Sequence, residues 1–256
     1  GVEEVGKAVA NLDVVTGDLQ MAVMKTRMQP IKKVFGRFPR VVRDLARSLK
    51  KEVTMEMVGE DTDLDKNLVG ALADPLVHMG RNAVDHGIEP PDERVAAGKP
   101  PTGTVRLTAA HEEGHVVVTV QDDGQGIDPA RVRRAAVSRG LLSEEEAAQL
   151  DDDEVVALIF APNLSTAERV SETSGRGVGM DVVQTNVKRL GGSVAVESEV
   201  GQGTTFRITL PLTLAILQAM MVALGDDVYA IPLTGVIESI YMESVTVSSI
   251  KGSPAI

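Results

Sequence analysis

The sequence contains no cysteine and no tryptophan, and aromatic residues make up only 2% of it. Without cysteine the chain can form neither a disulfide framework nor a thiolate metal site. With so few aromatic rings, the hydrophobic core must be built from aliphatic side chains and methionine. The lack of cysteine also fits a reducing compartment.

The chain also lacks an excess of positive charge and a long apolar run. Its formal net charge is -11, which disfavours a nucleic-acid partner, because neutralising phosphates requires a basic surface. The longest apolar run, residues 210–225, includes a threonine and a glutamine and is shorter than a membrane span. No signal peptide is visible at the N-terminus. We therefore expect neither nucleic-acid binding nor membrane insertion.

The length of 256 residues suits one full domain with smaller attachments, and both ends look cut, so we expect a fragment of a longer protein. At the N-terminus, apolar residues recur at alternating steps of three and four: Val5, Ala8, Leu12, Val15, Leu19 and Ala22. This spacing predicts a helix packed in a bundle or coiled coil with partners outside the fragment. A single amphipathic helix lying on its own domain fits the spacing equally well.

The middle of the chain alternates between strand and helix patterns. Strands are predicted at residues 53–58, 104–110, 115–121, 193–198 and 204–210, and helices at 64–86, 130–138, 153–160 and 178–190. The last of these strands has one apolar and one polar face. The pattern predicts an α+β fold, a two-layer sandwich in which helices cover one face of a mixed sheet.

One predicted helix carries polar residues that its apolar surroundings do not explain. In HMGRNAVDHG these residues recur at helical spacing: His78, Asn82, Asp85 and His86. Zinc would need a third nitrogen or sulfur ligand from far away, whereas an amide oxygen such as that of Asn82 suits Mg²⁺ held together with phosphates. Ordinary capping groups are the structural alternative, and we favour the magnesium–nucleotide interpretation.

Two glycine-rich motifs follow. DDGQGID places Asp122, Gly124 and Gly126 directly after a strand, where the carboxylate could accept a hydrogen bond from an exocyclic amine such as that of adenine. When this motif is taken alone, a tight strand-to-helix turn with a solvated acidic pair is the favoured explanation. SGRGVGMDVV precedes a helix, whose free amides can bind anions. GQGTTF adds a hydroxyl at Thr204. The polar, acidic segment 141–174 between the motifs predicts a lid.

In this order, the motifs resemble the GHKL ATP-binding superfamily and, within it, the CheA family of chemotaxis histidine kinases. RMQPIKKVFGRFPRVVRDLA, DPLVHMGRNAVDHGIEPPDERVAAGK, DDGQGID, IFAPNLSTAE, SGRGVGMDVV and GTTFRITLPLTLAILQAM are all similar to CheA segments. The lid reads APNLSTA, where CheA proteins usually have Gly-Phe in place of Asn163 and Leu164.

The resemblance implies ATP and Mg²⁺ as ligands. Asn82 would coordinate Mg²⁺ between the phosphates, and the catalytic His78 would lie next to the transferred γ-phosphate. Asp122 would bind the adenine amine, with Gly124 in the same loop and Gly126 leaving room for the ring. The other implied nucleotide-binding residues are Asp85, His86, Arg131, the lid glycines Gly175, Gly177 and Gly179, and Thr204.

The same resemblance implies three parts: residues 1–28 as the end of a dimerisation helix, 29–211 as the kinase catalytic domain, and 212–256 as the start of an SH3-like, CheW-like regulatory domain. The expected partners are a phosphotransfer domain acting in trans, a second copy of the chain, a CheW-like adaptor, chemoreceptors and response regulators. The expected location is cytoplasmic, at receptor arrays.

Three functions remain open at this point, and the first is a protein-histidine kinase core of the CheA type. In hydrolytic relatives the first motif position is typically Glu, which activates water, so His78 favours phosphoryl transfer over hydrolysis. A GHKL ATPase or ATP-gated clamp is the alternative. A scaffold with a decayed pocket is the third, against which the intact Asn82, Asp122 and glycines argue.

Overall fold

The computed structural model describes residues 2–162, 164, 179–212, 219–225, 227–232, 236, 248–250 and 253–255. The chain divides into two compact units, Gly1–Leu214 and Ala215–Ile256. Each unit is described by itself. None of the helices within the described ranges combines the length and the apolar character that crossing a bilayer requires.

A five-stranded mixed sheet organises the first unit. In spatial order its strands are β2 (Val53–Val58), β4 (Gly103–Glu112), β5 (His115–Asp122), β7 (Gly203–Pro211) and β6 (Ser193–Glu199). β2 pairs with β4 in parallel, and the other neighbours pair antiparallel. All five strands coincide with strands predicted from the sequence, so the predicted mixed sheet is confirmed.

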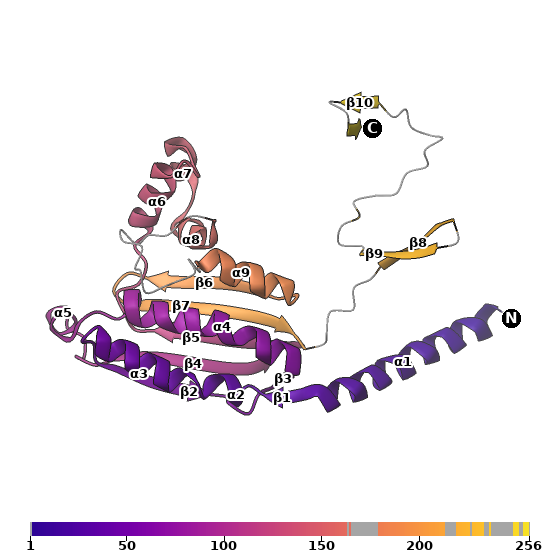
Figure 1. Cartoon of the computed structure of the whole chain (residues 1–256), viewed down its shortest axis with the longest axis horizontal. Helices are drawn as coiled ribbons and strands as arrows, with labels where there is room; N and C mark the ends of the chain where they lie inside the picture. The colour runs from indigo at the N-terminus through magenta and orange to yellow at the C-terminus, as the bar shows by residue number, and fades with distance from the viewer. Residues whose placement is uncertain are drawn as a thin grey trace. The chain divides into compact units, whose positions relative to one another are not determined.

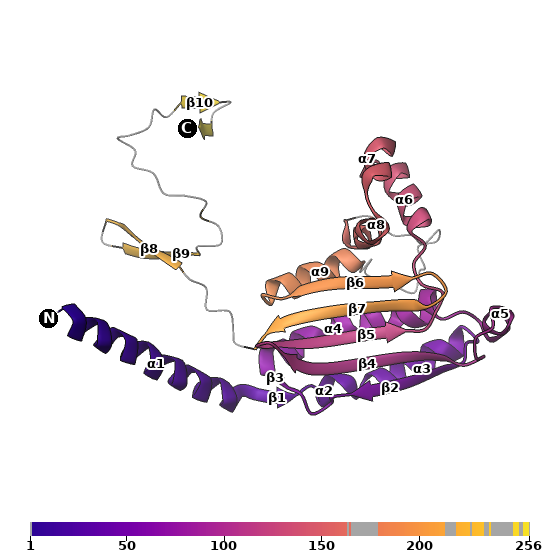
Figure 2. The same cartoon turned by 180° about the vertical axis from the view of Figure 1, so that it is seen from behind.

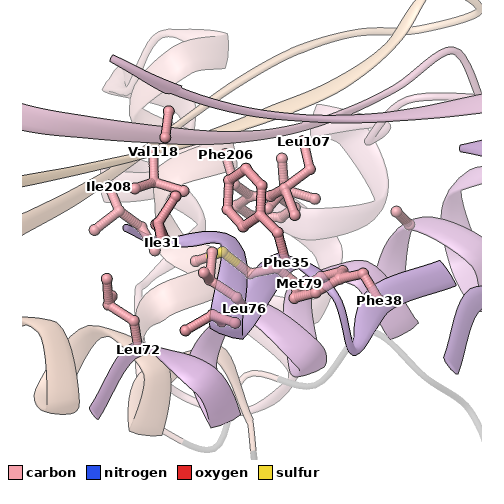
Figure 3. Packing of buried hydrophobic residues seen from close by; sticks show 14 of the residues in the cluster. Ile31, Phe35, Phe38, Leu72, Leu76, Met79, Leu107, Val118, Phe206 and Ile208 are labelled. Carbon is pink, nitrogen blue, oxygen red and sulfur yellow. The ribbon is translucent and has the colours of Figure 1, made fainter. Parts of the chain in front are cut away.

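Helices cover one face of this sheet. Figures 1 and 2 show α3 (Phe38–Ser48), α4 (Lys66–Asn82) and α9 (Met180–Arg189) on the same side of the strands. Between the layers lies an apolar cluster, part of which is shown in Figure 3: Ile31, Phe35, Phe38, Leu72, Leu76, Met79, Leu107, Val118, Phe206 and Ile208. The two-layer α+β sandwich is therefore confirmed, and its core is mainly aliphatic.

The helix with the polar residues does not remain α-helical to its end. α4 stops at Asn82, and Ala83–Gly87 form a π-helical turn, η1. The Lys51 ammonium donates hydrogen bonds to the main-chain oxygens of Val84 (2.9 Å) and Asp85 (2.6 Å), which supports the wider turn. The assumed α-helical register therefore fails beyond Asn82.

The predicted lid is partly a folded helical segment. After α6 (Pro129–Ser138), the chain forms α7 (Glu144–Gln149), α8 (Asp152–Ala157) and the 3₁₀ turn η2 (Leu158–Phe160). Both α7 and α8 begin with a capping box, in which the N-cap side chain and the glutamate three residues later exchange hydrogen bonds. α6, α8 and the residues after η2 share a small core of their own, formed by Val132, Ala136, Val155 and Leu164. Residue 163 and residues 165–178, which include the rest of the predicted lid, lie outside the described residues.

A long helix precedes the sandwich. α1 (Val2–Arg27) exposes apolar side chains at the positions that predicted a bundle helix, including Val5, Leu12, Val15 and Leu19. Next, β1 (Met28–Pro30) pairs antiparallel with β3 (Asp63–Asp65), and the short helix α2 (Lys32–Phe35) follows. The buried carboxylate of Asp65 caps the start of α4 by accepting a hydrogen bond from the main-chain amide of Asn67. It also accepts a hydrogen bond from the Arg27 side chain.

Two pairs of short strands lie in the described residues of the second unit. β8 (Ala219–Leu224) pairs with β9 (Asp227–Pro232), and β10 (Ser248–Ile250) pairs with β11 (Ser253–Ala255), both antiparallel. That these strands open an SH3-like domain stays a prediction.

Candidate functional site

Asp122 is a buried carboxylate at the end of β5, with 4% of its surface exposed. Burial raises the pKa of Asp122 to about 7, and the nearby Asp123 and Glu89 carboxylates act in the same direction. Hydrogen bonds from the main-chain amides of Gly124 and Thr204 oppose this shift. A carboxylate that is this dry but still hydrogen-bonded is suited to accept a further hydrogen bond from a ligand amine.

Close glycine contacts join the D-x-G-x-G loop to the π turn and to β6. A side chain at Gly87 would place its Cβ atom 2.9 Å from the Asp122 carboxylate, and one at Gly124 would lie 2.1 Å from the Gly87 oxygen. The Gly87 oxygen also accepts a hydrogen bond from the Gln125 amide (2.9 Å). Gly126 has φ +74°, and a Cβ there would lie 2.3 Å from the Glu199 oxygen. These glycines are needed for close packing, whatever room they also leave for a ligand.

Thr204 lies directly opposite Asp122 across the β5–β7 pair. Its hydroxyl is 3.0 Å from the Ser198 hydroxyl, which accepts a hydrogen bond from the Ile127 amide (2.8 Å). These contacts join the start of β7, which carries Thr204, to the loop after Gly126. The structure thus brings together Asp122, Gly124, Gly126 and Thr204, as the sequence predicted for one ligand site.

His78 and Asn82 lie on the part of α4 that faces the start of α9. The Asn82 side-chain amide donates a hydrogen bond to the sulfur of Met180 at 3.3 Å, and Gly179 is the N-cap residue of α9. The pKa of His78 is lowered, first by burial and then by the charges of Arg81 and His86, while Asp181 acts in the opposite direction. His78 is therefore neutral near pH 7, and its ring nitrogens can accept as well as donate hydrogen bonds.

Asp85 and His86 belong to the π turn, and the His86 side chain is 62% exposed. Arg131 is exposed in the first turn of α6. Gly175 and Gly177 lie outside the described residues, so of the second glycine motif only Gly179 is placed. Two surface hollows of about 490 and 510 Å³ do not include the site residues: one is lined by residues 57, 59–63 and 111, and the other by 112, 113, 115, 117, 207 and 209.

The donor set suits a magnesium ion that phosphates and water would largely coordinate. Asn82 offers an amide oxygen, which is a hard ligand of the kind Mg²⁺ takes. Among the residues that the structure describes, no group of three or more His, Cys, Asp or Glu could hold a metal ion. The magnesium site that we expect does not require such a group, since one or two protein ligands suffice.

Several residues that support this site were not predicted from the sequence. They are Lys51, which binds the π turn, and a cluster of buried or half-buried charges beside the D-x-G-x-G loop: Glu89, Arg94, Lys99 and Asp123. They come from stretches whose charged residues are expected, from the sequence alone, to lie on the solvated surface. The Pro-flanked segment PPDERVAAGK gave no periodic pattern that would have indicated a buried arginine.

Residues 71–214 match the family model described as "Histidine kinase-, DNA gyrase B-, and HSP90-like ATPase". Similar curated proteins are "Sensor histidine kinase CheAY" of Helicobacter pylori, 48% identical over 251 residues, and "Chemotaxis protein CheA" of Treponema pallidum, 50% identical over 240 residues. The alignments cover 98% and 94% of this chain but only 31% and 29% of the relatives. A third, "Chemotaxis protein CheA" of Bacillus subtilis, is 43% identical over 92% of this chain and 35% of its own length.

The chain therefore spans about a third of the length of the curated relatives it matches, and the resemblance inferred from its motifs is confirmed. The matched region contains α4 from residue 71 onward, the D-x-G-x-G loop, α9 and β7, which are the elements that build the site. The chain belongs to the histidine kinase-, DNA gyrase B- and HSP90-like ATPase family, and within that family its relatives are CheA proteins.

Proposed function

We propose that this chain is the ATP-binding core of a chemotaxis histidine kinase of the CheA type. It transfers the γ-phosphoryl group of ATP to a histidine on a separate phosphotransfer domain, leaving ADP. The observation that carries this proposal is that α9 and the D-x-G-x-G loop both contact the C-terminal end of α4 and the π turn that follows it. Asn82 contacts Met180 at the start of α9, and five residues later Gly87 packs against Asp122.

In this proposal the base of the nucleotide binds near the end of β5. Asp122 accepts a hydrogen bond from the adenine amine, for which its ionised carboxylate is the stronger acceptor. Gly124 and Gly126 keep the loop close-packed, and Gly126 leaves room for the ring. Thr204 contributes its hydroxyl near the adenine or the phosphate end of the nucleotide. Support comes from the burial of Asp122 and from its direct pairing with Thr204.

The phosphates bind between α4 and α9. Asn82 supplies an oxygen to Mg²⁺, whose charge would offset the charge that develops on the transferred phosphoryl group. His78 lies near the γ-phosphate, and Gly175, Gly177 and Gly179 close over it. Asp85, His86 and Arg131 contact phosphate or ribose. Hydrolytic relatives typically have at this position a glutamate that orients and deprotonates water, and its replacement by His78 favours transfer over hydrolysis.

The phosphoryl acceptor lies on another domain. The sequence has four histidines: His78, His86, His111 and His115. None of them falls on α1, where a sensor kinase with its acceptor on the bundle helix would carry it. The domain limits remain those proposed above: 1–28, 29–211 and 212–256.

In the whole protein we propose dimerisation through α1, which exposes its apolar stripe. Residues 212–256 contribute to binding a CheW-like adaptor and chemoreceptors. Response regulators take the phosphoryl group downstream, and the protein works in the cytoplasm at receptor arrays.

The test is phosphotransfer in trans. The chain is incubated with Mg²⁺ and γ-labelled ATP, with and without an isolated CheA phosphotransfer domain, and phosphate release is followed in parallel. We expect label on the added domain, none on this chain, and little release without acceptor. Asn82→Ala should abolish the transfer. Label on a histidine of this chain, or rapid phosphate release without acceptor, would contradict the proposal, and the second result would indicate a GHKL ATPase.

A further inference from the structure

The segment that follows the π turn folds back against the D-x-G-x-G loop through a fully buried arginine. Arg94, in α5 (Pro91–Ala96), has an exposed fraction of 0%. Its guanidinium donates hydrogen bonds to the Pro100 oxygen (2.8 Å), the Glu89 carboxylate (3.0 Å) and both the main-chain oxygen (3.1 Å) and the carboxylate (3.0 Å) of Asp123. One side chain thus ties the α5 segment to the residue that follows Asp122.

A lysine completes this arrangement. The Lys99 ammonium donates hydrogen bonds to the Glu89 carboxylate (2.8 Å) and to the main-chain oxygens of Asp123 (2.9 Å) and Gly124 (2.6 Å). The Asp123 carboxylate also accepts a hydrogen bond from the Thr104 amide at 2.8 Å, which fixes the loop to β4. We call Glu89, Arg94, Lys99 and Asp123 the Arg94 cluster.

Burying the charges of the Arg94 cluster costs free energy, so the cluster contributes little net stability to the fold. Removing charges from water offsets much of their mutual attraction, and apolar side chains of similar volume often stabilise a protein as well. What a fully hydrogen-bonded ionic network provides is a defined geometry, because each donor has a directed acceptor. Here the acceptors include consecutive main-chain oxygens of the loop that starts at Asp122.

The cluster also sets the charge around Asp122. The carboxylates of Asp123 and Glu89 both favour the protonated form of Asp122. Arg94 and Lys99 lie against these same two carboxylates and offset their charge. An adenine amine is a donor, so the ionised form of Asp122 is the one that can accept from both of its oxygens.

We infer that Arg94 and Lys99 are positioning residues that give the site its selectivity for adenine, because they fix the loop from which the Asp122 carboxylate projects. Neither side chain needs to touch the nucleotide. The cluster discriminates between two kinds of purine nucleotide: those that have the exocyclic amine of adenine and those that have a carbonyl group in its place. This inference rests on the proposed nucleotide site and adds its specificity.

The test compares binding of ATP and inosine triphosphate, which has a carbonyl in place of the amine, by equilibrium titration with Mg²⁺. Lys99→Met keeps the aliphatic stem but loses all three hydrogen bonds, whereas Lys99→Arg retains donors. Lys33→Met removes an exposed lysine of α2 and is the matched control. Unfolding curves are recorded for each variant, so that binding is measured where the protein is folded.

We expect the parent chain and Lys33→Met to prefer ATP. Lys99→Met should lose about tenfold in ATP affinity with little change for inosine triphosphate, so that the ratio falls, and Lys99→Arg should restore most of it. If Lys99→Met does not fold, the double variant Glu89→Gln/Lys99→Met, which leaves less unpaired charge, takes its place.

Two outcomes would overturn the inference. In one, Lys99→Met is less stable but keeps the parent ratio; in the other, it loses affinity equally for both nucleotides. A parent chain that binds neither nucleotide would instead contradict the proposed function. The failure of the two proposals is therefore distinguishable.

Discussion

The side-chain amide of Asn82 donates a hydrogen bond to the sulfur of Met180, with 3.3 Å between the nitrogen and the sulfur. The amide nitrogen is therefore engaged by α9, and the amide oxygen is the atom left for another partner. A thioether is a weak acceptor but cannot donate, so Met180 favours the amide orientation in which the oxygen is available to a cation.

We predict that Met180→Leu weakens Mg²⁺-dependent ATP binding about threefold, because leucine has a similar volume but no acceptor atom. ATP binding without Mg²⁺ should be unchanged. Met180→Gln, whose amide oxygen can accept, should recover the lost affinity. Titrations with and without Mg²⁺ measure both effects, and equal affinities for the Met180→Leu variant and the parent would show that the sulfur does not orient Asn82.

Asp122 should make stability depend on pH. Its pKa is about 7 in the folded chain and near the ordinary 3.8 in the unfolded chain. Between these values the folded chain binds a proton that the unfolded chain has released. The protonated form therefore stabilises the folded chain fully below the lower pKa. This stabilisation, up to about 4 kcal/mol in total, is lost as the pH rises towards and through the upper pKa.

Asp122→Asn cannot titrate, so its free energy of unfolding relative to the parent should rise between about pH 4 and about pH 7. Urea unfolding of both proteins at several pH values measures this. Over the same range, ATP affinity of the parent should increase as the carboxylate ionises, and the variant should bind ATP poorly at every pH. A stability difference that does not vary with pH would exclude titration of Asp122 in this window.

Gly87→Ala should damage the site through steric contact. The added Cβ atom would lie 2.9 Å from the Asp122 carboxylate, closer than such atoms approach, so the carboxylate must move. We expect ATP affinity to fall about tenfold or more, with a loss of stability of about 1–3 kcal/mol.

Gly70→Ala is the matched control, since Gly70 lies on α4 and an added Cβ there meets no atom within 4 Å. That variant should bind ATP normally and gain about 1 kcal/mol from its higher helix propensity. Calorimetric binding and thermal unfolding of the two variants test the pair. Normal ATP binding by Gly87→Ala would mean that the position of Asp122 does not matter for the nucleotide.

Lys51→Met should destabilise the π turn. It removes the ammonium that binds the oxygens of Val84 and Asp85. Because both bonds involve a charged donor that is half-buried, we expect a loss of about 1.5–3 kcal/mol in urea unfolding. The neighbouring Lys50 is exposed, and Lys50→Met should change stability by less than about 0.5 kcal/mol. Equal effects of the two substitutions would show that the contact does not stabilise the turn.

The sheet and its helical layer could be predicted from the sequence because their patterns are periodic. Alternation along β7 and apolar steps along α4 come directly from burying one face of each element. Asp122 could be identified as a candidate because it follows a strand and precedes two glycines. Its contact with Gly87 could not, because close approach between two loops depends on tertiary packing.

Two other features were missed for different reasons. The helix α7 lies in an acidic stretch that the sequence pattern assigns to a lid, although Ser143 and Glu146 have the capping-box spacing that could have identified its start. The neighbouring α8 overlaps the helix predicted at residues 153–160. The π turn and the burial of Arg94 gave no comparable pattern. Whether a charge is solvated or paired inside the protein depends on partners from distant segments, here Asp123.

The parallel pairing of β2 with β4 has a consequence for how the chain acquires its structure. β4 and β5 are joined by a two-residue turn in which Glu113 and Gly114 have positive φ, so these strands can pair locally and early. The connection from β2 to β4 contains the whole of α4, and its ends can meet only after a long loop has closed. Closing this connection brings the edge strand β2 into the sheet and docks the helix bearing His78 and Asn82 in the same step, so that this strand and the phosphate side of the ligand site form together.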